Sequence, residues 1–172
     1  VNPRNSFGYY DKNWGRDFSS PYFHLSSSNF TSEISGRLLD ASVFAVQGEY
    51  KNKVSVLVSI EGKNIEFHAN KLKKNQISYD CQEMNGTEDE GLKLHWSVSV
   101  HDRRYVIDID IFCNTKEMSL RDFESPAGGR KVMRILASGS GTGKFKLYKK
   151  MKKNLELLEQ ADISKCICEY GN

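Results

Sequence analysis

The sequence has little of what marks several protein classes. Its 172 residues include 3 prolines and 13 glycines, too few for a collagen-like or low-complexity chain. It lacks any run of about 18 apolar residues, so we expect no membrane-spanning helix. The formal charge of +3 gives no reason to expect nucleic-acid binding. Charged residues at 27% and aromatic residues at 11% instead predict a folded chain with one substantial core.

Cysteine and histidine are also sparse, and their spacing predicts no metal site. Cys166 and Cys168 are separated by one residue, whereas zinc sites usually place about two to four residues between paired cysteines. On a strand these two side chains point to the same face, which favours reduced thiols in an apolar wall over a disulfide or a metal site. The histidines do not have the spacing of metal ligands either. They are His24, His68, His95 and His101.

Alternation of apolar and polar residues with a period of two dominates the chain. It is clearest in Val54–Ile60, Trp96–Val100 and Tyr105–Cys113. Turn signals such as Glu61-Gly62-Lys63-Asn64 separate these segments. The pattern predicts an all-β fold, an antiparallel β-barrel of about nine or ten strands with minimal helix, in a single domain over residues 1–172. We expect strands at 22–30, 36–47, 53–60, 64–70, 77–83, 92–100, 104–113, 118–123, 144–149 and 155–168. For the last, a helix over its first residues, 155–161, is an alternative, because these are good helix formers.

The run Gly139-Ser-Gly-Thr-Gly-Lys144 has the composition of a phosphate-binding loop but not its spacing. That loop needs four residues between its glycines and then Lys followed by Ser or Thr, whereas Phe145 follows Lys144 here. The residues after it alternate like a strand, so they offer no helix N-terminus to a phosphate. We expect a loop between strands and no bound nucleotide or other cofactor.

Lysines cluster after this run, and two interpretations stay open. An anionic membrane surface would suit the cluster, which makes peripheral membrane contact one expectation. Alternatively, the lysines belong to a solvent-exposed hairpin, where their charge prevents edge-to-edge pairing with the sheets of other molecules. The cluster comprises Lys144, Lys146, Lys149, Lys150, Lys152 and Lys153.

Asp108 and Asp110 lie two residues apart on one expected strand and therefore share a face. In a closed cavity, one of two neighbouring carboxyl groups would have a raised pKa and act as a general acid. On a solvent or inter-domain face they would do nothing of the kind. Their strand face also carries Arg104, which suits solvent, and Phe112, which does not, so both alternatives remain.

The segment Asp11–Phe30 resembles a signature of the tocopherol cyclase family. An acidic residue followed by Lys12-Asn13-Trp14-Gly15, then Phe18, Phe23 and Phe30, fits that pattern without gaps. Weaker likenesses follow in Val106-Ile-Asp-Ile-Asp110, Phe123-Glu-Ser-Pro126 and Gly143-Lys-Phe-Lys-Leu147. The family has Trp where this chain has His24, and tends to have Trp at the position of Tyr22.

The resemblance implies a lipocalin-like barrel that forms the C-terminal half of a two-domain protein, with an N-terminal domain of the same protein as its partner. It implies a hydrophobic, isoprenoid-like ligand and cofactor-free ring closure of a prenylated quinol. Alternatives are a non-catalytic lipid or isoprenoid binder and a purely structural half.

By residue type, Asp108 and Asp110 are the catalytic candidates. Trp14 is either a core plug or a ligand platform. We expect a cytoplasmic or membrane-peripheral rather than a secreted protein. The candidate ligand contacts are Trp14, Tyr22, Phe23, His24 and Trp96.

Overall fold

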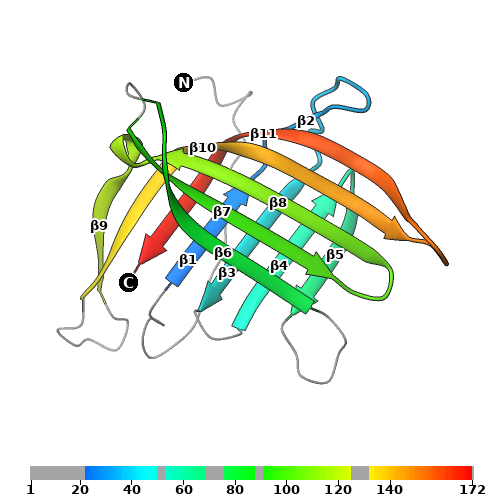
Figure 1. The fold of residues 1–172 in the computed structure, drawn as a ribbon, viewed down its shortest axis with the longest axis horizontal. Coiled ribbons are helices and arrows are strands. Elements are labelled where there is room, and N and C mark those ends of the chain that lie inside the picture. The colour runs from blue at the N-terminus through cyan, green and yellow to red at the C-terminus, as the bar shows by residue number, and fades with distance from the viewer. Residues whose placement is uncertain (1–21, 50–52, 69–75, 88–90, 125–131, 172) are drawn as a thin grey trace.

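A computed structural model of the chain describes residues 22–49, 53–68, 76–87, 91–124 and 132–171 (Figure 1). These residues form antiparallel strands and one short 3-10 helix, η2 (Thr115–Glu117). The strands are β1 (Tyr22–Ser27), β2 (Phe30–Ser32), β3 (Val43–Glu49), β4 (Lys53–Ile60), β5 (Lys63–His68), β6 (Gln76–Asn85), β7 (Leu92–His101), β8 (Tyr105–Asn114), β9 (Ser119–Glu124), β10 (Val132–Lys150) and β11 (Leu155–Gly171).

All of these strands belong to one sheet. Its hydrogen-bonded order is β5-β4-β3-β1-β11-β10-β8-β7-β6, with β2 paired to β11 and β9 paired to β10. The sheet curls over so that β6, β7, β8 and β10 lie across β1, β3, β4 and β5 (Figure 1). The prediction of an all-β, antiparallel fold with minimal helix is confirmed. The sheet has 11 strands rather than nine or ten and, within the described ranges, does not close into a barrel, because β5 and β6 end the path without pairing to each other.

The core lies between the two layers of the curled sheet. Alternation places Trp96 of β7 and Ile109 of β8 on the inner face, and both are fully buried. Aromatic rings from three other strands meet inside. The ring of Phe145 on β10 lies 5.3 Å from that of Phe30 on β2 and 6.4 Å from that of Phe44 on β3. Such pairs contribute about 0.5–1.5 kcal/mol each beyond their buried area, so this cluster binds the two layers together.

The glycine-rich run is part of β10, and the prediction of a loop there was wrong. The pairing of β10 with β11 shifts register between Ser138 and Gly141 and again between Gly141 and Gly143. On the opposing strand, Lys165 takes a left-handed conformation with φ of 53°. Bulges and glycines of this kind bend a sheet sharply, so this run forms the corner over which β10 and β11 pass between the layers.

The C-terminal strand contradicts the alternative that residues 155–161 form a helix. Residues Leu155–Ala161 contain good helix formers, yet they belong to β11 and pair with β10 from Lys150 to Phe145. Cross-strand pairing therefore overrides local helix propensity here. Among the described residues, no helix has the length and apolar character to cross a membrane.

Candidate ligand-binding interior

Trp96 supplies the most unusual group of the interior. Its indole is fully buried, and its Nε1–H has no hydrogen-bond acceptor in the described part of the chain. The residues paired with it on the same face are Cys81 of β6 and Ile111 of β8, neither of which offers a side-chain oxygen. Buried donors nearly always have a partner, so an orphan of this kind is unusual.

Trp96 is only one strand away from the edge of the sheet. β6 is that edge strand, and its inward residues Tyr79 and Cys81 are partly exposed although they pack against the core. The ring of Tyr79 stacks on the ring of Phe23 from β1, with centroids 4.4 Å apart. This pair joins the two layers beside the β6 edge.

Gly48 makes room for Phe23 in this pair. A Cβ at Gly48 would stand 2.7 Å from Cε1 of Phe23 and 2.9 Å from Cγ2 of Val54. The Phe23 ring and the Val54 side chain have no space to move away, because both residues are buried. The glycine therefore sets the position of the Phe23 ring in the interior.

The interior is also lined by thiols, which cluster over Gly141. Gly141 pairs with Cys166 of β11 and has no side chain, so the thiols of Cys113 on β8 and Cys168 on β11 reach each other across β10. Cys113, Cys166 and Cys168 are buried, and all four cysteines are reduced, as we expected.

Three of the thiols, those of Cys113, Cys168 and Cys81, are held neutral. The hydrogen bond that Cys113 donates to Cys168 and burial both raise the pKa of Cys113. The hydrogen bond with Cys113 lowers the pKa of Cys168, but the one with Cys166 and burial outweigh it and raise the pKa overall. Burial and nearby acidic residues raise the pKa of Cys81 to about 12. Neutral thiols are poor nucleophiles and poor metal ligands, so they serve here as a polarisable apolar lining.

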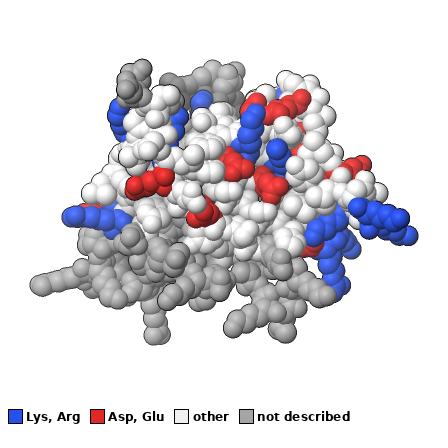
Figure 2. All heavy atoms as spheres, in the orientation of Figure 1, with Lys and Arg blue, Asp and Glu red and all other residues white. Residues whose placement is uncertain are grey.

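Asp108 and Asp110 lie on the outer face of the sheet, opposite Trp96. Ser99 Oγ donates a hydrogen bond to Asp108 at 2.7 Å. His95 Nε2 lies 3.1 Å from Asp110 Oδ1, and the His95 ring stacks on Phe112 at 4.2 Å. Figure 2 shows acidic and basic residues interspersed on this face. The two aspartates thus belong to a half-buried polar surface, the outer-face alternative of the sequence, and not to the interior.

The other sequence-predicted ligand contacts separate in the same way. Phe23 and Trp96 face the interior, whereas Tyr22 and His24 lie on the opposite face of β1. Tyr22 donates a hydrogen bond to Glu169 at 2.9 Å, and His24 Nε2 lies 3.2 Å from Ser26 Oγ. Trp14 lies outside the described residues, as do its neighbours Asn13 and Gly15.

Sequence reasoning missed Tyr79 as an interior residue. The available signal was the alternation of Ile77, Tyr79 and Cys81 with Ser78 and Asp80 along β6. The stacking of Tyr79 on Phe23 had no sequence signal, because the two strands are not paired.

Comparison with known proteins adds no relative. No family model, no curated protein and no solved structure matched the chain. The described residues also contain no group of three or more His, Cys, Asp or Glu side chains placed to hold a metal ion. The chemistry of the site is therefore argued from its own geometry.

Proposed function

We propose that this chain is the ligand-binding β domain of a tocopherol cyclase-like protein, and that it holds an elongated, isoprenoid-like molecule with a hydrogen-bond-accepting oxygen. The observation that carries the proposal is the buried Nε1–H of Trp96, which has no acceptor within the described ranges. An unsatisfied buried donor costs about 1–3 kcal/mol, and a ligand oxygen at hydrogen-bond distance would remove that cost. The resemblance of residues 11–30 supports the same class of ligand.

The interior favours an apolar ligand over an ionic one. Its buried residues within the described ranges are aliphatic, aromatic or thiol-bearing, and no Asp, Glu, Lys or Arg is among them. A charged ligand would lose its hydration without gaining a counter-ion. A prenyl chain would instead exchange water for contacts with these side chains, at about 0.8 kcal/mol for each buried CH₂.

Binding is favoured over ring closure by the position of the aspartates. Addition of a phenolic hydroxyl across a double bond needs a proton donor beside the ligand. Asp108 and Asp110 are bonded to Ser99 and His95 on the outer face, away from Trp96. The proposal therefore assigns them no catalytic step and keeps to binding.

Titration with a prenylated hydroquinone tests the proposal. The chain has 2 tryptophans, so Trp14→Phe leaves Trp96 as the sole reporter of the interior. We expect a saturable change in its emission. In equilibrium dialysis, Trp96→Phe removes the N–H donor while keeping an aromatic ring. The hydroquinone should then bind about two- to tenfold more weakly than it binds the native chain.

The matched ligand is a prenylated benzene without the two hydroxyl groups. It should bind the native chain and Trp96→Phe equally, because it has no oxygen for the indole to reach. An emission of Trp96 that stays unchanged at every soluble concentration of hydroquinone would refute the proposal. Equal weakening of both ligands by Trp96→Phe would show that the indole acts through packing alone.

A further inference from the structure

The turn between β10 and β11 projects beyond the rest of the sheet (Figure 1). β10 pairs with β8 as far as Lys149, and the N–H of Lys150 donates to the carbonyl of Arg104 at 2.7 Å. Beyond this point the hairpin stands alone. In the described part of the chain, residues 155–158 of β11 pair with β10 only. We call residues 148–157, which comprise this free end and the last β10 residues bonded to β8 and its preceding turn, the projecting hairpin.

One face of the projecting hairpin carries exposed apolar side chains and one lysine. Tyr148 pairs with Leu157, and Lys150 pairs with Leu155, so all four residues share a face. Met151 follows at the turn. The exposed fractions are 48% for Met151, 50% for Leu155 and 41% for Leu157. Three large apolar side chains are thus presented to solvent within seven residues of sequence.

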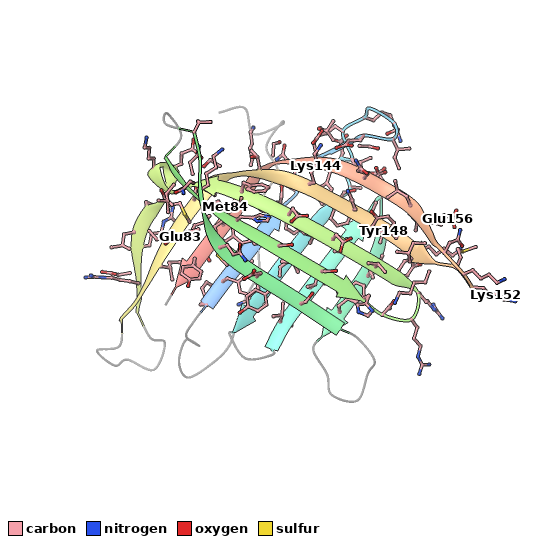
Figure 3. The ribbon with its side chains drawn as sticks, in the orientation of Figure 1. Glu83, Met84, Lys144, Tyr148, Lys152 and Glu156 are labelled. Atoms are coloured by element: carbon pink, nitrogen blue, oxygen red, sulfur yellow. The ribbon has the colours of Figure 1, made fainter. Side chains whose placement is uncertain are left out.

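Cations surround this face. The turn between β7 and β8 lies beside the hairpin, because Lys150 Nζ donates to the Asp102 carbonyl at 2.8 Å and lies 3.2 Å from His101 Nδ1. Figure 2 shows Lys and Arg gathered at this end, and Figure 3 places Lys152 at the outermost turn. The cations are Arg103, Arg104, Lys149, Lys150, Lys152 and Lys153; the neighbouring acids are Asp102 and Glu156.

Protection of a sheet edge explains only part of this composition. Lysines at a free edge prevent pairing between molecules, and Lys152 and Lys153 form no ion pair within the described ranges. An edge built only to stay in solution gains nothing from exposed Met151 and Leu155, which raise the tendency to aggregate. Exposed apolar side chains surrounded by cations complement a partner whose outer layer is anionic and whose interior is apolar.

We propose that the projecting hairpin binds the surface of an anionic lipid bilayer. Met151, Leu155 and Leu157 would enter the boundary between headgroups and acyl chains, and Tyr148 would lie at the headgroup level with its hydroxyl in water. Lys152, Lys153 and their neighbours would contact the lipid phosphates. This inference does not depend on the ligand of the interior, since none of these residues belongs to the buried core.

Vesicle co-sedimentation of the full chain tests the proposal. Vesicles of phosphatidylglycerol and phosphatidylcholine in equal amounts should bind the chain, and vesicles of phosphatidylcholine alone should bind it far more weakly. Because each cation near the surface contributes about 1 kcal/mol, Lys152→Gln with Lys153→Gln should weaken binding at least tenfold. Met151→Ser with Leu155→Ser should weaken binding comparably, and added salt should not restore it.

Two matched controls show whether vesicle binding depends on the hairpin or on any exposed charge or apolar side chain of the molecule. Arg37→Gln with Arg121→Gln removes the same charge from exposed positions elsewhere, and Leu120→Ser removes a more exposed leucine from β9. Both should bind vesicles as the native chain does. Equal loss in the controls, or no preference for anionic vesicles, would overturn the proposal. The proposal would also fail if RNA displaced the chain from the vesicles while the variant Met151→Ser with Leu155→Ser bound them normally. That result would identify a site for polyanions in general.

Discussion

Gly143 on β10 packs directly against the backbone of Asp110 on β8. A Cβ at Gly143 would overlap the Asp110 carbonyl oxygen and would stand 2.8 Å from the carbonyl carbon and 2.9 Å from Cα of Ile111. Backbone atoms of a paired strand have no room to withdraw. Gly143 therefore allows the close approach at which β10 bends over the interior.

Gly143→Ala should destabilise the chain by about 3 kcal/mol or more, at the upper end of the cost of overpacking. Urea unfolding followed by circular dichroism measures the change. Gly139→Ala is the matched control, because a Cβ at Gly139 meets no atom within 4 Å. It should change the free energy of unfolding by less than about 1 kcal/mol. Similar losses in both variants would mean that chain flexibility, and not the approach to Asp110, requires glycine here.

Asp108→Asn and Asp110→Asn should leave binding of a prenylated hydroquinone within about twofold of the native value. Both carboxylates face outward and bond to Ser99 and His95, so neither touches the interior. Equilibrium dialysis measures the effect, with Trp96→Phe as the variant that should lose affinity. A tenfold or greater loss in either aspartate variant would place the carboxylates in the ligand site.

Stability should fall at alkaline pH because of the buried thiols. Folding raises the pKa of Cys113, Cys168 and Cys81, the last to about 12, whereas unfolded thiols titrate near about 8.5. Their contribution is therefore complete below about pH 8.5. It is lost as the pH rises toward the folded-state pKa, because the unfolded chain then releases protons that the folded chain retains.

Urea midpoints measured from pH 8 to pH 11 test this dependence. Cys113→Ala removes one titrating thiol and should make the decline with pH shallower than in the native chain. Ser140→Ala changes a neighbour 3.9 Å from the Cys113 sulfur that does not titrate, and it should keep the native slope. If Cys113→Ala and the native chain decline in parallel, the thiol is not the group responsible.

The sequence was most informative where side chains alternate. The strand expected at 53–60 has the same bounds as β4. The strand expected at 92–100 differs from β7 by one residue at its end, and the strand expected at 104–113 is shifted from β8 by one residue at each end. Alternation also showed that Asp108 and Asp110 share a face. It left open which face, because a phenylalanine such as Phe112 does not suit solvent. The stacking of His95 on Phe112 covers that ring on the outer side.

The sequence was least informative where structure depends on contacts between distant segments. The middle of β10 contains Gly141 and Gly143, which have low strand propensity, and their role appears only against Cys168 and Asp110 of other strands. Trp96 was predicted as a ligand contact from its residue type. The missing acceptor at its Nε1–H depends on every neighbour in three dimensions, so no pattern in the chain reveals it.

The indole N–H resonance of Trp96 tests the central claim most directly. With Trp14→Phe, the ¹⁵N-labelled chain should give one indole N–H signal, at the high-field position of a donor without an acceptor. Saturation with a prenylated hydroquinone should move that signal downfield as the ligand oxygen accepts the hydrogen bond, and the prenylated benzene should not. A signal that lies downfield without ligand, or that stays in place when the hydroquinone is saturating, would contradict the account.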